Sequence, residues 1–274
     1  FLSDLLEEFG DEWANKWMFH YRWARPIDQR VVALRLAHEM LPPNSRDDDE
    51  QLVDVADMIR VRMSGRGFAV GSNDVTGPMI ERSFRDGIAQ LERHFQARPG
   101  RTFLLGSRPC FGDFGMGCQI YQALIDPTAG ALLRDTAPRV SAWCARVAVQ
   151  DVESATAGGA SQGQWESWEA LRPTLEPFLR DQVGGVFLTW MRANAECIER
   201  KSKTCEVSIP GLGRWVSAVG GPQKYQLKSL KAIQEKFARA AAADHGEDLV
   251  DLMKATNCFE VLAMEGAQVR RAKL

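Results

Sequence analysis

The sequence predicts an all-α fold that carries one small β-hairpin. Apolar residues recur at helical spacing through most of the 274 residues, whereas the stretch near 204–218 alternates with a period of two around a Pro-Gly turn. No pattern of strands alternates with the helices. Because a parallel α/β sheet requires that alternation, the sequence excludes one.

The composition is that of a soluble globular protein, with 45 % hydrophobic and 26 % charged residues. The 34 basic and 36 acidic residues nearly balance, which argues against a nucleic-acid or membrane-surface protein. No apolar run approaches the ~20 residues of a membrane span. The six cysteines form no CxxC pair and no zinc spacing with histidine, so we predict reduced thiols, no metal and a cytoplasmic location.

Residues 3–24 predict a long first helix that Pro26 ends, with Ser3 as its N-cap. Its apolar residues fall on two stripes, so the helix should be covered on more than one side. The chain enters this pattern without a starting Met or a signal-like segment. We therefore expect that a natural N-terminal part precedes Phe1.

Two further helices are predicted over residues 27–41 and 47–63, and a Gly-rich loop follows over 64–78. The glycines of this loop follow a helical pattern rather than a buried strand, so they do not form a dinucleotide-binding fingerprint. The next helix should span residues 79–95, with apolar side chains along one face.

The segment from 103 to 146 contains the most informative pattern of the chain. A helix over 111–125 opens with Asp113 in its first turn, and a loop around Pro127 leads to a helix over 138–149 that carries Trp143. Asp113 occupies the acidic position of a capping box, although Cys110 is a poor cap. We predict structural roles for Asp113 and Trp143.

Small polar residues over 155–163 predict a linker, which divides the chain into domains at 1–152 and 164–274. The second domain should be helical over 165–201, with breaks at Pro173, Pro177 and the Gly184-Gly185 pair. The hairpin near 204–218 and helices over 222–243 and 247–256 complete it.

The sequence FLLGSRPCFGDFGMGCQIYQ, followed by PRVSAWCARV, resembles the middle helices of the glutathione S-transferase C-terminal domain. Asp113, Pro138 and Trp143 stand at matching positions, and the first helix resembles an atypical bacterial branch of the family. The resemblance extends over about residues 1–149. It implies a helical bundle in which the helices between 26 and 63 are two insertions, and everything from 165 onward is a C-terminal extension.

In this family the helical domain packs against an N-terminal thioredoxin-like domain, which binds glutathione and carries the catalytic Tyr, Ser or Cys. The resemblance therefore places no catalytic residue in this chain. It implies that glutathione is a co-substrate held by the other domain, and that the protein is a homodimer. Trp13, Trp17, His20 and Tyr21 combine aromatic bodies with polar tips. We predict that they form the wall for a small hydrophobic electrophile, with core packing as the alternative.

Two functions remain open from the sequence. The first is the helical part of a glutathione transferase, and the second is a non-catalytic interaction module that has kept the fold. The chain has no GxSxG, HExxH or P-loop motif to suggest other chemistry. Lysines 224, 228 and 231 predict a solvated helix face rather than a nucleic-acid patch.

Overall fold

The computed structural model describes residues 1–46, 48–148, 163–217 and 223–264. Within them the protein is all-α with one two-stranded antiparallel sheet, which confirms the predicted fold class. The first half contains α1 (Leu2–Phe9), the π-helix η1 (Gly10–Ala14), α2 (Asn15–Ala24), α3 (Pro26–Met40), the short η2 (Pro43–Ser45), α4 (Asp49–Ser64), the short η3 (Gly67–Val70), α5 (Gly77–Gln96), α6 (Phe111–Leu124), α7 (Pro127–Thr136) and α8 (Pro138–Ala148).

The second half forms an extension that is helical except for the predicted hairpin. It contains α10 (Trp168–Phe178), the π-helix η5 (Leu179–Leu188), α11 (Thr189–Glu199), β1 (Cys205–Ile209), β2 (Gly213–Ser217), α12 (Lys224–Ala241), α13 (Gly246–Ala255) and α14 (Phe259–Leu262). The two strands pair in register from Cys205 opposite Ser217 to Ile209 opposite Gly213.

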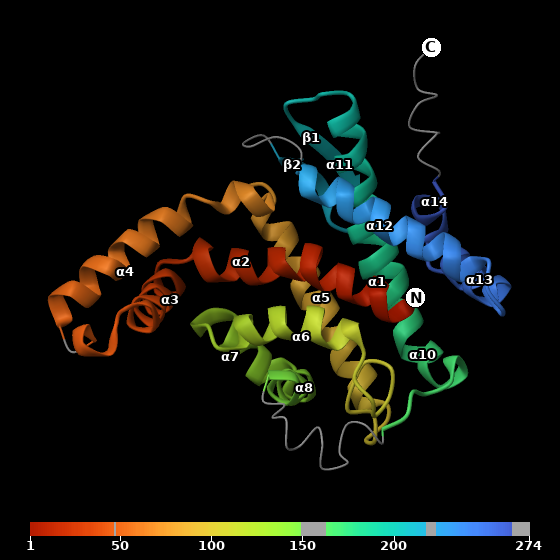
Figure 1. Ribbon diagram of the computed structural model, residues 1–274, viewed down its shortest axis with the longest axis horizontal. Coiled ribbons are helices and arrows are strands. Elements are labelled where there is room, and N and C mark those ends of the chain that lie inside the picture. Colours follow the sequence, from red (N-terminus) through yellow and green to blue (C-terminus); the bar gives the residue numbers. More distant parts are fainter. Residues whose placement is uncertain (47, 149–162, 218–222, 265–274) are drawn as a thin grey trace.

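The elements α1, η1 and α2 follow one another without a break, and α6 packs along them. Figure 1 shows α6 between this first helix and α8, in the middle of the bundle. Gly10 makes the close approach possible, because a Cβ there would lie 2.3 Å from the backbone nitrogen of Met116. The predicted N-cap is wrong: α1 starts at Leu2, and the hydroxyl of Ser3 instead accepts a hydrogen bond from the Phe111 N–H at 2.9 Å.

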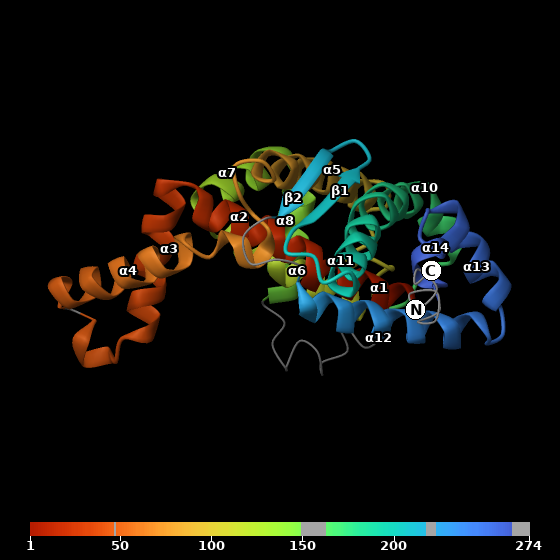
Figure 2. The same ribbon diagram turned by 90° about the horizontal axis from the view of Figure 1, so that it is seen from above.

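Helices α3 and α4 pack against each other and project from the bundle as a helical hairpin (Figures 1 and 2). A small core that is separate from the main one packs this hairpin together and against the end of α2; its buried residues are Trp23 of α2 with Val32, Ala33, Ala37 and Ala56. The hairpin therefore holds its shape without contributing to the central packing.

Three prolines lie within helices, although the sequence predicts a loop or a helix break at each of them. Pro127 starts α7 instead of lying in a loop, because the first turn of a helix does not need its missing N–H. Pro173 and Pro177 lie inside α10, and the helical path continues through η5 to α11. Wide π turns are common where the regular hydrogen-bond ladder is disturbed, and η5 begins two residues after Pro177.

The Gly184-Gly185 pair also lies within this helical path instead of breaking it. A Cβ at Gly184 would lie 2.1 Å from the carbonyl oxygen of Thr256, so this glycine allows the loop after α13 to approach η5. The extension and the first half share one continuous hydrophobic core. Most of the predicted linker lies outside the described residues, and the division into domains at 152 and 164 stays a prediction.

Candidate functional site

The predicted aromatic wall lies deep in the molecule. Trp13 and Tyr21 are 0 % exposed and Trp17 is 1 % exposed. Both indole N–H groups donate to one hydroxyl, that of Ser83 on α5, at 2.9 Å from Trp13 and 3.1 Å from Trp17. Because Ser83 in turn donates to Gln182 at 3.0 Å, the two tryptophans are tied to both α5 and η5.

The extension covers this aromatic face. Trp13 packs against the rings of Trp190 and Trp215, with ring centroids 5.9 and 5.5 Å apart. One helical turn earlier, Phe9 packs edge-on against Phe178 and Phe187 at 5.3 and 5.7 Å. A ligand could therefore reach the Trp13 and Trp17 rings only if these parts of the extension moved away.

His20 joins the first helix to the Gly-rich loop and to α5. Its Nδ1 lies 2.8 Å from the Ser72 hydroxyl and its Nε2 lies 3.1 Å from a Glu81 carboxylate oxygen. Burial lowers the pKa of His20, and Glu81 opposes that shift. Arg25 also pairs with Glu81 and lies over the ring of neighbouring Tyr21.

The Tyr21 phenol oxygen is buried and has no hydrogen-bond partner among the described residues. Burial raises the pKa of this phenol, so it stays protonated at neutral pH. Trp13, Trp17, His20 and Tyr21 thus lie together along one helix, as predicted. Their role in binding a substrate stays a prediction.

Asp113 lies at the centre of the segment that the sequence analysis singled out. Its side chain is fully buried and accepts three hydrogen bonds, from the Leu104 N–H at 2.8 Å, the Cys110 N–H at 2.8 Å and the Trp143 indole N–H at 2.9 Å. Burial raises the pKa of this carboxyl, and the hydrogen bonds offset part of that rise. One carboxylate therefore joins the loop before α6, the start of α6 and α8.

The outer face of α6 carries an apolar stripe that the sequence analysis missed. We call it the α6 stripe; it consists of Phe111, Phe114, Cys118, Tyr121 and Ile125. Phe111 is 66 % exposed and Phe114 is 44 % exposed. The spacing of three and four residues was the available signal, but periodicity alone cannot tell a covered face from an exposed one.

No described helix is long and apolar enough to cross a membrane. In the part of the chain that the structure describes, no group of three or more His, Cys, Asp or Glu residues could hold a metal ion.

The described helices form an all-α bundle whose central helix α6 opens on the buried Asp113. Residues 45–146 match the family model of the glutathione S-transferase C-terminal domain, and this match spans α4 to α8. Over these residues the chain is therefore similar to the glutathione S-transferase C-terminal domain. Comparison with curated proteins gives no match, and comparison with solved structures gives none either.

Proposed function

We propose that this chain is the helical half of a glutathione S-transferase-type protein, and that the α6 stripe packs against a thioredoxin-like domain. The carrying observation is that Phe111 and Phe114 are exposed on the helix that the buried Asp113 anchors. Covering a phenylalanine side chain is worth about 1.5–3 kcal/mol, so a partner surface here would gain appreciable binding free energy.

Members of this family generally pair the helical domain with a thioredoxin-like domain and often dimerise. In the proposed assembly the thioredoxin-like domain binds glutathione and activates its thiol, and the helical domain contributes the wall for a hydrophobic electrophile. The thiolate would then attack the electrophile to form a thioether; with chlorodinitrobenzene the C–S bond replaces the C–Cl bond and chloride leaves. No residue of this chain is assigned to the activation of the thiol.

The test compares variants of the longest protein that the gene encodes. Phe111→Asp combined with Phe114→Asp places charge on the α6 stripe, and Met58→Asp on α4, where the side chain is 64 % exposed, is the matched control. We expect the double variant to lose glutathione conjugation to chlorodinitrobenzene and to become sensitive to limited proteolysis, while the control stays like the wild type. Equal behaviour of the two variants would rule out the docking role.

The second candidate is a non-catalytic interaction module of the same fold. It is favoured by one observation: the extension of the chain itself packs on Phe9 and Trp13, the face expected to receive the electrophile. This candidate predicts a protein whose α6 stripe is still needed for assembly but which conjugates no electrophile. Conjugation by the wild-type protein above the uncatalysed rate would eliminate it.

A further inference from the structure

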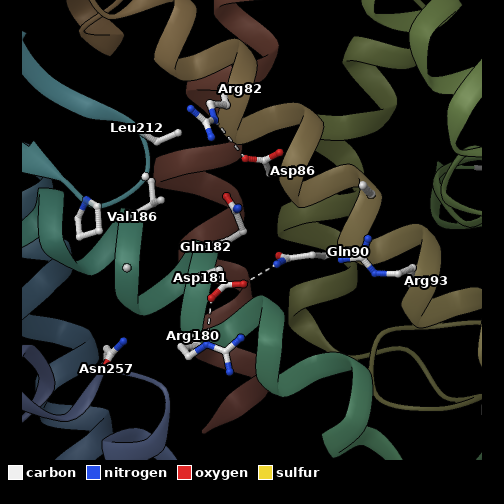
Figure 3. A pocket seen from close by; sticks show the side chains of 14 residues that line it. Arg82, Asp86, Gln90, Arg93, Arg180, Asp181, Gln182, Val186, Leu212 and Asn257 are labelled. Atoms are coloured by element: carbon white, nitrogen blue, oxygen red, sulfur yellow. Dashed lines mark hydrogen bonds and ion pairs between the residues drawn. The ribbon is translucent and has the colours of Figure 1, made fainter.

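A polar cleft of about 550 Å³ lies between α5 and the extension (Figure 3). Arg82, Asp86, Gln90 and Arg93 line it from α5, and residues 180–182 and 185–186 of η5 line the opposite wall. The turn of the β-hairpin at 210–212 and Asn257 also line it. Ligand sites commonly have this volume, and here the extension supplies half of the walls.

The rim of the cleft is rich in arginine. Arg180 pairs with the adjacent Asp181 at 3.0 Å, and Arg82 lies 3.8 Å from Asp86. Arg93 makes no ion pair with any residue that the structure describes. With three arginines against two aspartates, the lining has an excess of positive charge that suits an anion.

Gln90 contributes a buried acceptor beneath this rim. The side-chain amide nitrogen donates to an Asp181 carboxylate oxygen at 2.8 Å, so the orientation of the amide is fixed because a carboxylate only accepts. The amide oxygen is consequently left without a partner among the described residues, although Gln90 is only 9 % exposed. Buried polar groups are nearly always paired, and an orphan beside a cleft suggests a missing donor.

Gln182, which also lines the cleft, is fixed by a hydrogen bond on the side of the tryptophans. Gln182 is 4 % exposed, and its amide oxygen accepts the hydrogen bond from Ser83 that links it to the two tryptophans. The apolar side chains of Val186 and Leu212 lie along the same cavity (Figure 3). The cleft thus combines cationic, amide and apolar surfaces.

We propose that this cleft binds a small organic anion that also carries O–H or N–H donors. The arginines would hold the phosphate or carboxylate group, and a donor of the ligand would pair with the Gln90 amide oxygen. Since that oxygen has almost no surface open to solvent, the atoms that cover it must move before a ligand can reach it. This assignment gives the extension a binding role that does not depend on glutathione or on a second domain.

Isothermal calorimetry on the chain tests the proposal with glucose 6-phosphate and glutamate as probes, and with glucose and inorganic phosphate as the neutral and bare-anion comparisons. Gln90→Met and Arg93→Ala alter the site. Gln96→Met at the exposed end of α5 and Arg200→Ala at the exposed C-terminal end of α11, neither of which lines the cleft, are the matched controls.

We expect glucose 6-phosphate or glutamate to bind the wild type, and each site variant to weaken that binding at least tenfold while the controls leave it unchanged. Which probe binds identifies the anion as phosphate or carboxylate. Arg93 is exposed, so its variant tests the proposal even if Gln90→Met does not fold. Failure of both probes to bind at millimolar concentration, equal binding of glucose or inorganic phosphate, or binding that the site variants do not alter would overturn the proposal.

Discussion

Replacing Asp113 with alanine should remove about 3–6 kcal/mol from the free energy of unfolding. The substitution leaves three buried donors without an acceptor, on Leu104, Cys110 and Trp143. Each buried donor that loses its partner costs about 1–3 kcal/mol, and water entering the space can recover part of that loss. Because domains of this kind are stable by only about 5–15 kcal/mol, the variant should lose a large fraction of its stability.

Asp113→Asn separates the hydrogen bonds from the volume of the side chain. The single oxygen of the amide can still accept hydrogen bonds from Leu104 and Trp143, but its NH₂ group would face the Cys110 N–H. The loss in the free energy of unfolding should therefore be smaller, about 1–3 kcal/mol. Asp135→Ala on the exposed side of α7 is the matched control and should change stability by less than about 0.5 kcal/mol.

Urea unfolding followed by circular dichroism measures these differences, with the slope of the transition as a check on two-state behaviour. The expected order of stability is wild type and Asp135→Ala together, then Asp113→Asn, then Asp113→Ala. An Asp113→Ala variant within 1 kcal/mol of the wild type would refute the view that this carboxylate holds the bundle together.

Three further outcomes concern titratable groups. Burial and the nearby Arg101 guanidinium lower the pKa of His94 to about 4, so between pH 6.5 and 4 the unfolded chain takes up a proton that the folded chain does not, and the free energy of unfolding should fall by about 3 kcal/mol. In urea titrations at a series of pH values, His94→Gln should show a smaller fall, and the same pH dependence in the variant and the wild type would contradict this. Burial lowers the pKa of Lys16 to about 7, so the free energy of unfolding should rise between pH 7 and 10. At pH 7, Lys16→Met should raise the free energy of unfolding in urea titrations by about 2 kcal/mol, after allowing for the lost hydrogen bonds to Val70 and Gln223, and a variant less stable than the wild type would disprove this. Cys118 is exposed whereas Cys144 and Cys258 are fully buried, so Cys118→Ser should remove one thiol from those that react with Ellman's reagent in the native protein; an unchanged count would contradict the fold around α6.

The parts of the fold that depend on local sequence were predicted closely. The expected helices over 79–95 and 111–125 correspond to α5 and α6 within two residues at each end. The hydrogen bond from the Cys110 N–H to Asp113 also followed from the place of Asp113 in the first turn of a helix, because a capping interaction involves only neighbouring residues. The Pro-Gly turn fixed the hairpin for the same reason.

Tertiary contacts decided the features that were predicted wrongly. Ser3 could cap its own helix, but α6 begins close enough for Ser3 to accept a hydrogen bond from Phe111 instead. Gly184 resembles a helix breaker, yet it is the glycine that lets the Thr256 carbonyl approach η5. Such contacts join residues about 70 to 110 positions apart, and the local pattern of one sequence does not indicate which distant segment packs against a given residue.

The cover over the first helix bears directly on the choice between enzyme and interaction module. Five ring pairs join that helix to the extension: Phe1 with Phe237, Phe9 with Phe178 and with Phe187, and Trp13 with Trp190 and with Trp215. At about 0.5–1.5 kcal/mol each beyond the area that they bury, these pairs contribute several kcal/mol.

An electrophile that bound on the Trp13 face would have to displace these contacts. If the opening cost about 4 kcal/mol, the apparent affinity would fall by roughly a thousandfold, because every 1.4 kcal/mol is a factor of ten. A ligand with micromolar intrinsic affinity would then bind only at millimolar concentration. Conjugation by this protein therefore requires either that the extension moves readily or that the electrophile lies on another surface, and the non-catalytic module requires neither.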